Sequence, residues 1–167
     1  MAASKPRSAA AAAVAAQEPP PPPLLPHRGP VLVDSGPLLA LMNRRDAWHA
    51  RTRDWLAANR EAQLISTWPV LNEVTALLSR RIASAAAIDF LRWVQRGAVV
   101  VDTPQAVSLA EVLAISERFA DLPFDLADAS IAEAAARLKI RHLLSVDSDF
   151  DVYRDRSARA LINLLTA

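Results

Sequence analysis

The chain has 167 residues, enough for one domain with a buried core, and 52% of them are hydrophobic. The absence of cysteine excludes a disulfide framework, thiolate metal sites and a cysteine nucleophile. Three histidines and a formal net charge of +1 give little support to zinc sites, to serine–histidine–aspartate catalysis or to nonspecific nucleic-acid binding, so any metal site must be built from oxygen.

The first 29 residues are of low complexity, with an alanine-rich stretch followed by five consecutive prolines. This composition cannot bury a core, so we predict a disordered tail over residues 1–29 and a folded domain over residues 30–167. The alanines are too weakly hydrophobic for a signal peptide, and no uncharged apolar run reaches the roughly 18 residues of a membrane-spanning helix. We therefore expect a cytoplasmic protein.

From residue 30 onward, short apolar runs alternate with segments of helical periodicity. In chain order we predict strand 31–34, helices 35–42 and 46–60, and strand 62–66. Thr67 is expected to cap a helix that runs to about residue 81. Helix 84–95, strand 98–101, helices 104–119 and 126–139, and strand 142–146 follow. Residues 158–165 fit either a strand or a helix. Strands separated by helices predict an α/β sandwich with a mostly parallel central sheet flanked by helices.

Two acidic residues directly follow predicted strands. Asp34 ends the run Val31–Val33, and Asp147 follows the run that ends at Val146. In an open parallel sheet ligands bind beyond the carboxyl ends of the strands, so both carboxylates are expected at the same edge.

Two further acidic residues lie on the apolar faces of predicted helices. Glu73 shares a face with Val70 and Val74, and Asp128 has the same relation to Ile131. A buried carboxylate needs a partner, and no lysine or arginine shares either face in the local sequence. Four such carboxylates without histidine or cysteine suit Mg²⁺ or Mn²⁺, which would activate water for phosphodiester hydrolysis.

Most of these residues also have a structural alternative. Asp34 can cap the helix that follows it, Asp128 can form a capping pair with Asp125, and Asp147 and Asp149 can be turn residues. Glu73, in the middle of a helix, has no capping alternative.

Arginines and tryptophans raise the question of partners. Arginines cluster at 44–45, 51–53, 80–81, 92–96, 137–141 and 154–159, where they form either solvated helix faces or basic stripes for RNA. Trp48 and Trp55 are seven residues apart on one predicted helix face, which fits core packing or an apolar groove for a partner protein.

Four segments, in this order, carry a family resemblance: VLVDSGPLLAL at 31–41, NEV at 72–74, LADASIA at 126–132 and LLSVDSDF at 143–150. Together they resemble the PIN-domain family, in particular the toxin ribonucleases of the VapC type. The resemblance covers residues 30–165. Ser145 stands where the family more often has threonine, and the Ala/Pro tail is not part of the family pattern.

The resemblance implies a PIN-like nuclease domain and a Mg²⁺-dependent endoribonuclease. It assigns metal binding and catalysis to Asp34, Glu73, Asp128 and Asp147, with Asp149 as a possible outer residue. It also implies an RNA substrate, a homodimer and a cognate antitoxin protein. One alternative is a noncatalytic RNA-binding or scaffold PIN module, which would usually have lost one of the acids. A metal-dependent phosphatase is another, although it needs a second aspartate where Gly36 stands.

Overall fold

The structure is a computed structural model and describes residues 24, 26–122 and 124–166. The predicted disordered tail lies outside the described residues as far as residue 23. Leu24 packs partly against the core, and the backbone N–H of His27 donates to Asn59 Oδ1 at 2.5 Å. Contacts with the domain therefore begin a few residues before the predicted boundary at residue 30.

The domain is built on a five-stranded sheet of order β3-β2-β1-β4-β5. Every neighbouring pair in this sheet is parallel, which confirms the predicted α/β class. The strands are β1 (Gly29–Val33), β2 (Ala62–Thr67), β3 (Val100–Asp102), β4 (His142–Leu144) and β5 (Ile162–Asn163). The last three residues of the central strand β1 are buried, because Val31, Leu32 and Val33 are each at most 1% exposed.

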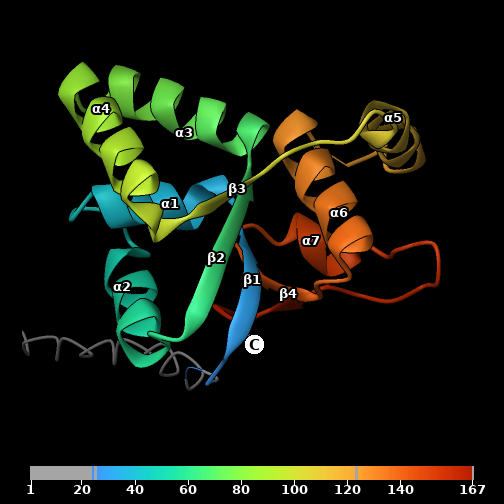
Figure 1. The fold of residues 1–167 in the computed structure, drawn as a ribbon, viewed down its shortest axis with the longest axis horizontal. Helices are drawn as coiled ribbons and strands as arrows, with labels where there is room; N and C mark the ends of the chain where they lie inside the picture. Colours follow the sequence, from blue (N-terminus) through green and yellow to red (C-terminus); the bar gives the residue numbers. More distant parts are fainter. Residues whose placement is uncertain (1–23, 25, 123, 167) are drawn as a thin grey trace, which may run out of the picture.

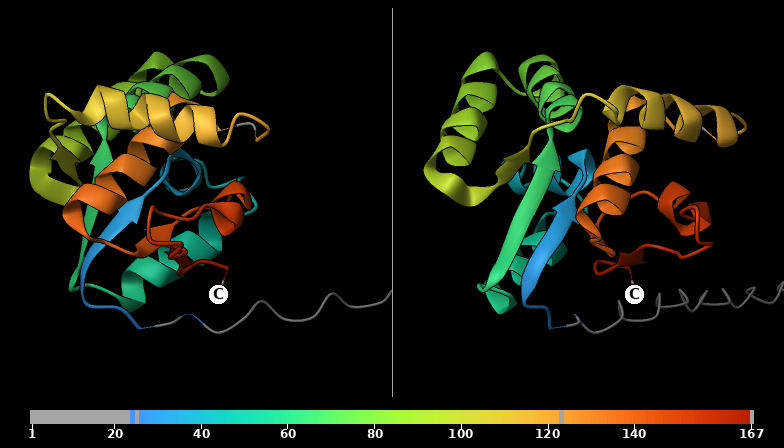
Figure 2. Two further views of the ribbon diagram at one scale, coloured as in Figure 1. Left: turned by 90° about the vertical axis from the view of Figure 1, so that its right-hand side faces the viewer. Right: turned by 45° about the vertical axis from the view of Figure 1, so that its right-hand side comes forward.

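Helices cover both faces of the sheet. They are α1 (Ser35–Met42), α2 (His49–Ala58), α3 (Trp68–Arg81), α4 (Ser84–Trp93), α5 (Ser108–Arg118), α6 (Leu126–Leu138) and α7 (Asp149–Val152), and a π-helical turn, η1 (Val94–Ala98), follows α4. Figures 1 and 2 show α1 to α4 on one side of the strands and α5 to α7 on the other. The chain changes sides between β1 and β4, and such a switch point opens a crevice at the carboxyl ends of the two strands.

Several boundaries differ from the sequence prediction. Helix α2 starts at His49 because Asp46 forms a turn, in which its Oδ1 accepts from the N–H of Trp48 at 2.9 Å. Helix α5 starts at Ser108, whose Oγ accepts from the N–H of Gln105 at 2.9 Å. The ambiguous C-terminal segment contains strand β5, and the short helix α7 was not expected.

Of the two tryptophans that could pack in the core or line a groove for a partner protein, one packs in the core. Trp55 is fully buried and belongs to the core, whereas Trp48 is half-buried. Within the described residues, none of the helices combines the length and apolar composition needed to cross a bilayer.

Candidate active site

Asp34 lies at the switch point between β1 and β4. Its backbone N–H donates to Leu144 O at 3.0 Å, so the pairing of the two strands continues up to this residue. Its side chain is only 4% exposed. Although Asp34 stands at the N-cap position of α1, its carboxylate accepts no capping hydrogen bond, so the capping alternative is wrong for this residue.

The hydroxyl of Ser145 connects the two strand-end acids. Ser145 Oγ donates to Asp34 Oδ2 at 3.0 Å and accepts from the backbone N–H of Asp147 at 2.9 Å. One buried hydroxyl thus fixes both the carboxylate after β1 and the backbone after β4. The sequence showed a hydroxylated residue here only as a feature of the family resemblance, without a role.

Asp128 takes part in the cap of its own helix and also interacts electrostatically with Asp34 and Asp147. Asp125 Oδ1 accepts from the N–H groups of Ala127 and Asp128, and Asp128 Oδ2 accepts from the N–H of Asp125 at 3.1 Å. This is a capping box, so the structural alternative is confirmed for Asp128. The capping box uses Oδ2 of Asp128, whereas Oδ1 of Asp128 has no hydrogen-bond partner among the described residues.

Asp147 and Glu73 complete the set. Asp147 is exposed, and its Oδ1 accepts from the N–H of Asp149 at 2.9 Å, which confirms the turn alternative for Asp147. Glu73 is half-buried on α3, and within the described residues its carboxylate has neither an ion pair nor a hydrogen bond.

The electrostatics of the site are those of an uncompensated acidic cluster. The pKa of Asp34 is raised to about 6, mainly by burial. The negative charges of Glu73 and Asp147 add to this rise, and hydrogen bonds from Ser35 and Ser145 oppose it. Burial likewise raises the pKa of Asp128 to about 7, with contributions from Asp34 and Asp147. Asp34 is therefore within electrostatic range of the other three carboxylates, and burial has a larger effect on its pKa than their repulsion.

The donor chemistry fits a hard divalent cation. Among the described residues no three Asp, Glu or His side chains are close enough to coordinate one ion as they stand. Mg²⁺, however, is usually held by one or two carboxylates and several waters, so a ready three-ligand cluster is not required. Asp34 and Asp128 carry destabilised negative charges, and a cation would relieve both.

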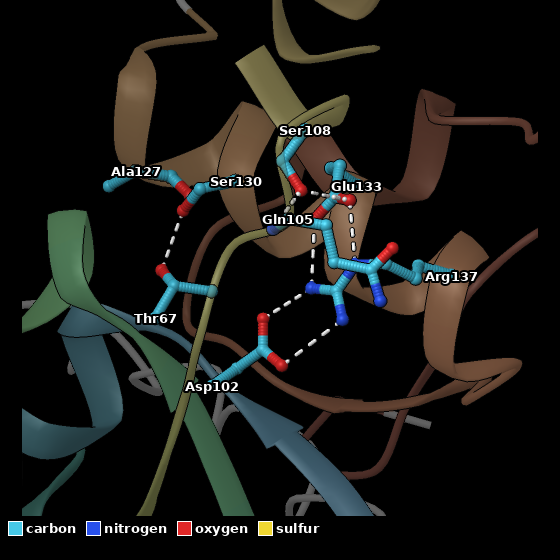
Figure 3. Close-up of polar contacts among 8 residues, drawn as sticks. All are labelled: Thr67, Asp102, Gln105, Ser108, Ala127, Ser130, Glu133 and Arg137. Carbon is cyan, nitrogen blue, oxygen red and sulfur yellow. Dashed lines mark hydrogen bonds and ion pairs between the residues drawn. The ribbon is translucent and has the colours of Figure 1, made fainter.

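The structure contains a second set of acidic side chains that the sequence analysis did not predict. Asp102 at the end of β3 forms a two-pronged ion pair with Arg137, which also bonds to Glu133 one turn earlier on α6 (Figure 3). Ser108 Oγ donates to Glu133 Oε1 at 2.8 Å. We call Asp102, Glu133 and Arg137 the paired cluster.

Both carboxylates of the paired cluster have a cationic partner, because they share Arg137. Burial opposes the charge on Glu133, but hydrogen bonds from Arg137 and Ser108 outweigh it, and the pKa of Glu133 lies below its ordinary value. The hydrogen bonds that Arg137 donates to Glu133 and Asp102 raise the pKa of its guanidinium group. The four-residue spacing of Glu133 and Arg137 was the one sequence signal available for this cluster.

A hydroxyl pair lies next to the paired cluster. Thr67, at the N-cap position of α3, makes no side-chain capping bond, and its Oγ1 lies 2.6 Å from Ser130 Oγ on α6 (Figure 3). Thr67 therefore joins the end of β2 to α6, which differs from the capping role its position suggests.

Comparison with known proteins identifies the family. The sequence profile of the PIN domain matches residues 31–155, whereas comparison with curated proteins gave no match. Two solved structures have a similar fold. VapC20 of Mycobacterium tuberculosis, described as a sarcin-ricin loop cleaving toxin, is 22% identical, with a TM-score of 0.67 over 72% of this chain and 92% of that chain. VapBC2 of Rickettsia felis, described as bound to a DNA fragment from its promoter, is 13% identical, with a TM-score of 0.54 over 73% and 91%. The chain belongs to the PIN domain family.

Proposed function

We propose that the chain is a Mg²⁺-dependent endoribonuclease and the toxin of a type II toxin–antitoxin pair. The observation that carries the proposal is the uncompensated acidic cluster of Asp34, Glu73, Asp128 and Asp147. None of these carboxylates is paired with a lysine or arginine in the part of the chain that the structure describes. The similarity of the fold to VapC toxins supports RNA as the substrate.

The four carboxylates would share the cation, which is Mg²⁺ or Mn²⁺, some of them directly and the others through its bound waters. When bound, the ion would lower the pKa of a water and offset negative charge on a phosphodiester oxygen. Asp34 would contribute an oxygen held in position by Ser145, and Asp128 would contribute the Oδ1 atom that its capping bond leaves available. Asp149, whose pKa is raised by burial and by the charge of Asp147, would act as an outer residue.

The test is cleavage of purified RNA with and without metal. We expect cleavage of structured RNA with Mg²⁺ or Mn²⁺ and none in EDTA. Ribosomal and transfer RNA should be compared, because VapC20 is described as cleaving the sarcin-ricin loop. Undiminished cleavage in EDTA would overturn the metal mechanism, and no cleavage under any condition would favour a noncatalytic module.

We further propose two protein partners, a cognate antitoxin and a second copy of the chain. We assign the contact between two copies to a hollow of about 290 Å³. It is bordered by Trp68, Leu109 and Leu126, which are 59%, 76% and 59% exposed. Exposed apolar side chains grouped in this way are typical of interfaces. Leu109→Glu should turn a dimer into a monomer in light scattering, whereas Ile88→Glu, an exposed apolar position on α4, should not. The antitoxin is tested by whether co-expression of a neighbouring short reading frame relieves toxicity.

A further inference from the structure

A groove of about 680 Å³ begins beside the acidic cluster and runs between α1, the loop after it and the end of α3. Gly36, two residues after Asp34, and Val146, directly before Asp147, line one part of it. Three arginines and one tryptophan line other parts: Arg44, Arg45, Arg81 and Trp48. The volume is within the range of about 300–1,000 Å³ of ligand-binding clefts.

The positive charge of this groove is only partly compensated by the protein, because three arginines and one aspartate line it. Arg44, Arg45 and Arg81 are exposed, and within the described residues none of them forms an ion pair with a carboxylate. Asp46 is the one acidic residue among the lining residues, and its Oδ1 accepts from the N–H of Trp48. The groove therefore combines a positive charge with an acidic site at one end.

Local hydrogen bonds fix the loop that carries two of these arginines. Asn43 Oδ1 accepts from the N–H of Arg45 at 3.2 Å, and Asn43 O accepts from the N–H of Asp46 at 2.9 Å. Arg81 can also interact favourably with the C-terminus of α3, but Arg44 and Arg45 lie outside any helix and have no such role. The loop thus presents the arginines from a defined backbone.

From this arrangement we infer that the groove binds the single-stranded part of an RNA substrate next to the cleaved bond. Arg44, Arg45 and Arg81 contact backbone phosphates, and the half-buried Trp48 provides a face on which one base stacks. Unpaired arginines beside an aromatic ring match the chemistry of a single strand, which offers phosphates and bases in alternation. The inference rests on the proposed function, because it assumes RNA as the substrate.

The test measures RNA binding without cleavage. A fluorescent single-stranded RNA is titrated into the Asp34→Asn protein in EDTA at several salt concentrations. Replacing all three arginines with alanine should reduce the slope of log K against log salt by about 2, since each phosphate contact on a single strand contributes about 0.7. The control replaces Arg60, Arg92 and Arg96, which are exposed and lie outside the groove, and removes the same charge.

Trp48 provides an independent readout. Trp48→Ala should weaken RNA binding about 5- to 100-fold, and Trp48→Phe should retain most of the affinity, because a smaller ring still stacks. RNA should quench the protein fluorescence less in Trp48→Phe than in Trp68→Phe, which lies outside the groove. Melting curves of each variant show whether it is folded.

Each outcome has a separate meaning. If the unmodified protein cleaves RNA with Mg²⁺ but the groove and control variants have equal salt slopes, the groove inference is overturned and the proposed function stands. If the groove variants bind RNA normally but no longer bind the cognate antitoxin, the groove is a protein-binding site instead. If the protein cleaves no RNA, the proposed function fails whatever the groove binds.

Discussion

Two sets of acidic side chains lie at the carboxyl edge of the same sheet, and they differ in their partners. In the paired cluster, Arg137 contacts both Asp102 and Glu133, so each carboxylate has a cationic partner. In the acidic cluster, neither Asp34 nor Asp128 has a lysine or arginine partner among the described residues, and their pKa values are raised to about 6 and about 7. An acid at a strand end is therefore not by itself a sign of catalysis; the absence of a cationic side chain beside it distinguishes a candidate metal site from a structural ion pair.

The most direct test of the difference between the two clusters is to neutralise residues of the acidic cluster. Asp34→Asn and Asp128→Asn should each reduce RNA cleavage by about 1000-fold or more, because a bound metal supplies several kcal/mol to the transition state. In EDTA both variants should melt at the same temperature as the unmodified protein or higher, since each loses a destabilised charge. Asp54→Asn, which changes an exposed acid paired with Arg53, should keep full activity. A variant that melts several degrees lower yet still cleaves would show that these acids are structural.

Removing Arg137 should convert the paired cluster into an uncompensated one. Its ion-pair partners have side chains that are only 11% and 7% exposed, so Arg137→Ala should lower the free energy of unfolding by about 3–5 kcal/mol in urea at pH 7. The deficit should be smaller at pH 5, because without Arg137 burial raises the pKa of Glu133 and protonation then removes a buried charge. Arg92→Ala breaks an exposed pair with Asp89 and should cost at most about 1 kcal/mol. Equal costs for the two substitutions would contradict the distinction.

The pH dependence of stability sharpens the same contrast. Asp34 has a pKa of about 6 in the folded chain and 3.8 as its ordinary value. The folded state therefore binds this proton more tightly, so the stability it contributes is complete below about pH 4 and is lost as pH rises through 6. Without metal, the free energy of unfolding should fall by about 2–3 kcal/mol over this range on account of Asp34. The slope should be smaller in Asp34→Asn, and a stability that instead rises over pH 4–7 in both proteins would contradict the assignment.

The smallest expected effect concerns Ser145. Ser145→Ala removes the hydrogen bonds to Asp34 and from Asp147 and should cost about 1–3 kcal/mol of stability. Because the hydroxyl lowers the pKa of Asp34, its loss should also move the acidic limb of the cleavage–pH profile to higher pH. Ser145→Thr keeps the hydroxyl and should restore the profile. A threonine variant that behaves like alanine would show that the effect comes from packing.

The sequence was sufficient to predict the alternation of strands and helices. It was also sufficient to predict that Asp34 and Asp147 lie at the edge of the sheet where the strands end. These features follow from local periodicity and from the geometry of parallel strands. The paired cluster could not be predicted, because Asp102 and Arg137 are distant in sequence and meet only when α6 packs on the sheet. For the same reason, the sequence did not reveal that Thr67 would bond to Ser130 rather than cap its helix.

The predicted start of a helix was wrong where a loop side chain accepts a backbone hydrogen bond and holds a turn in place of the helix. Asp46 was expected within a helix, but its carboxylate accepts from the backbone of Trp48 and holds a turn instead. The loop that carries Arg44 and Arg45 along the groove is therefore longer than predicted.

The capping box of α6 has a consequence for the order in which folding and cation binding occur. Asp128 is fixed by its bond to the N–H of Asp125 as soon as the first turn of α6 forms. A long side chain that must be immobilised on binding loses rotational entropy, whereas this carboxylate has already lost it during folding. Under the proposed function, one ligand is thus preorganised, so the cation would meet an oxygen whose orientation was set before it arrived.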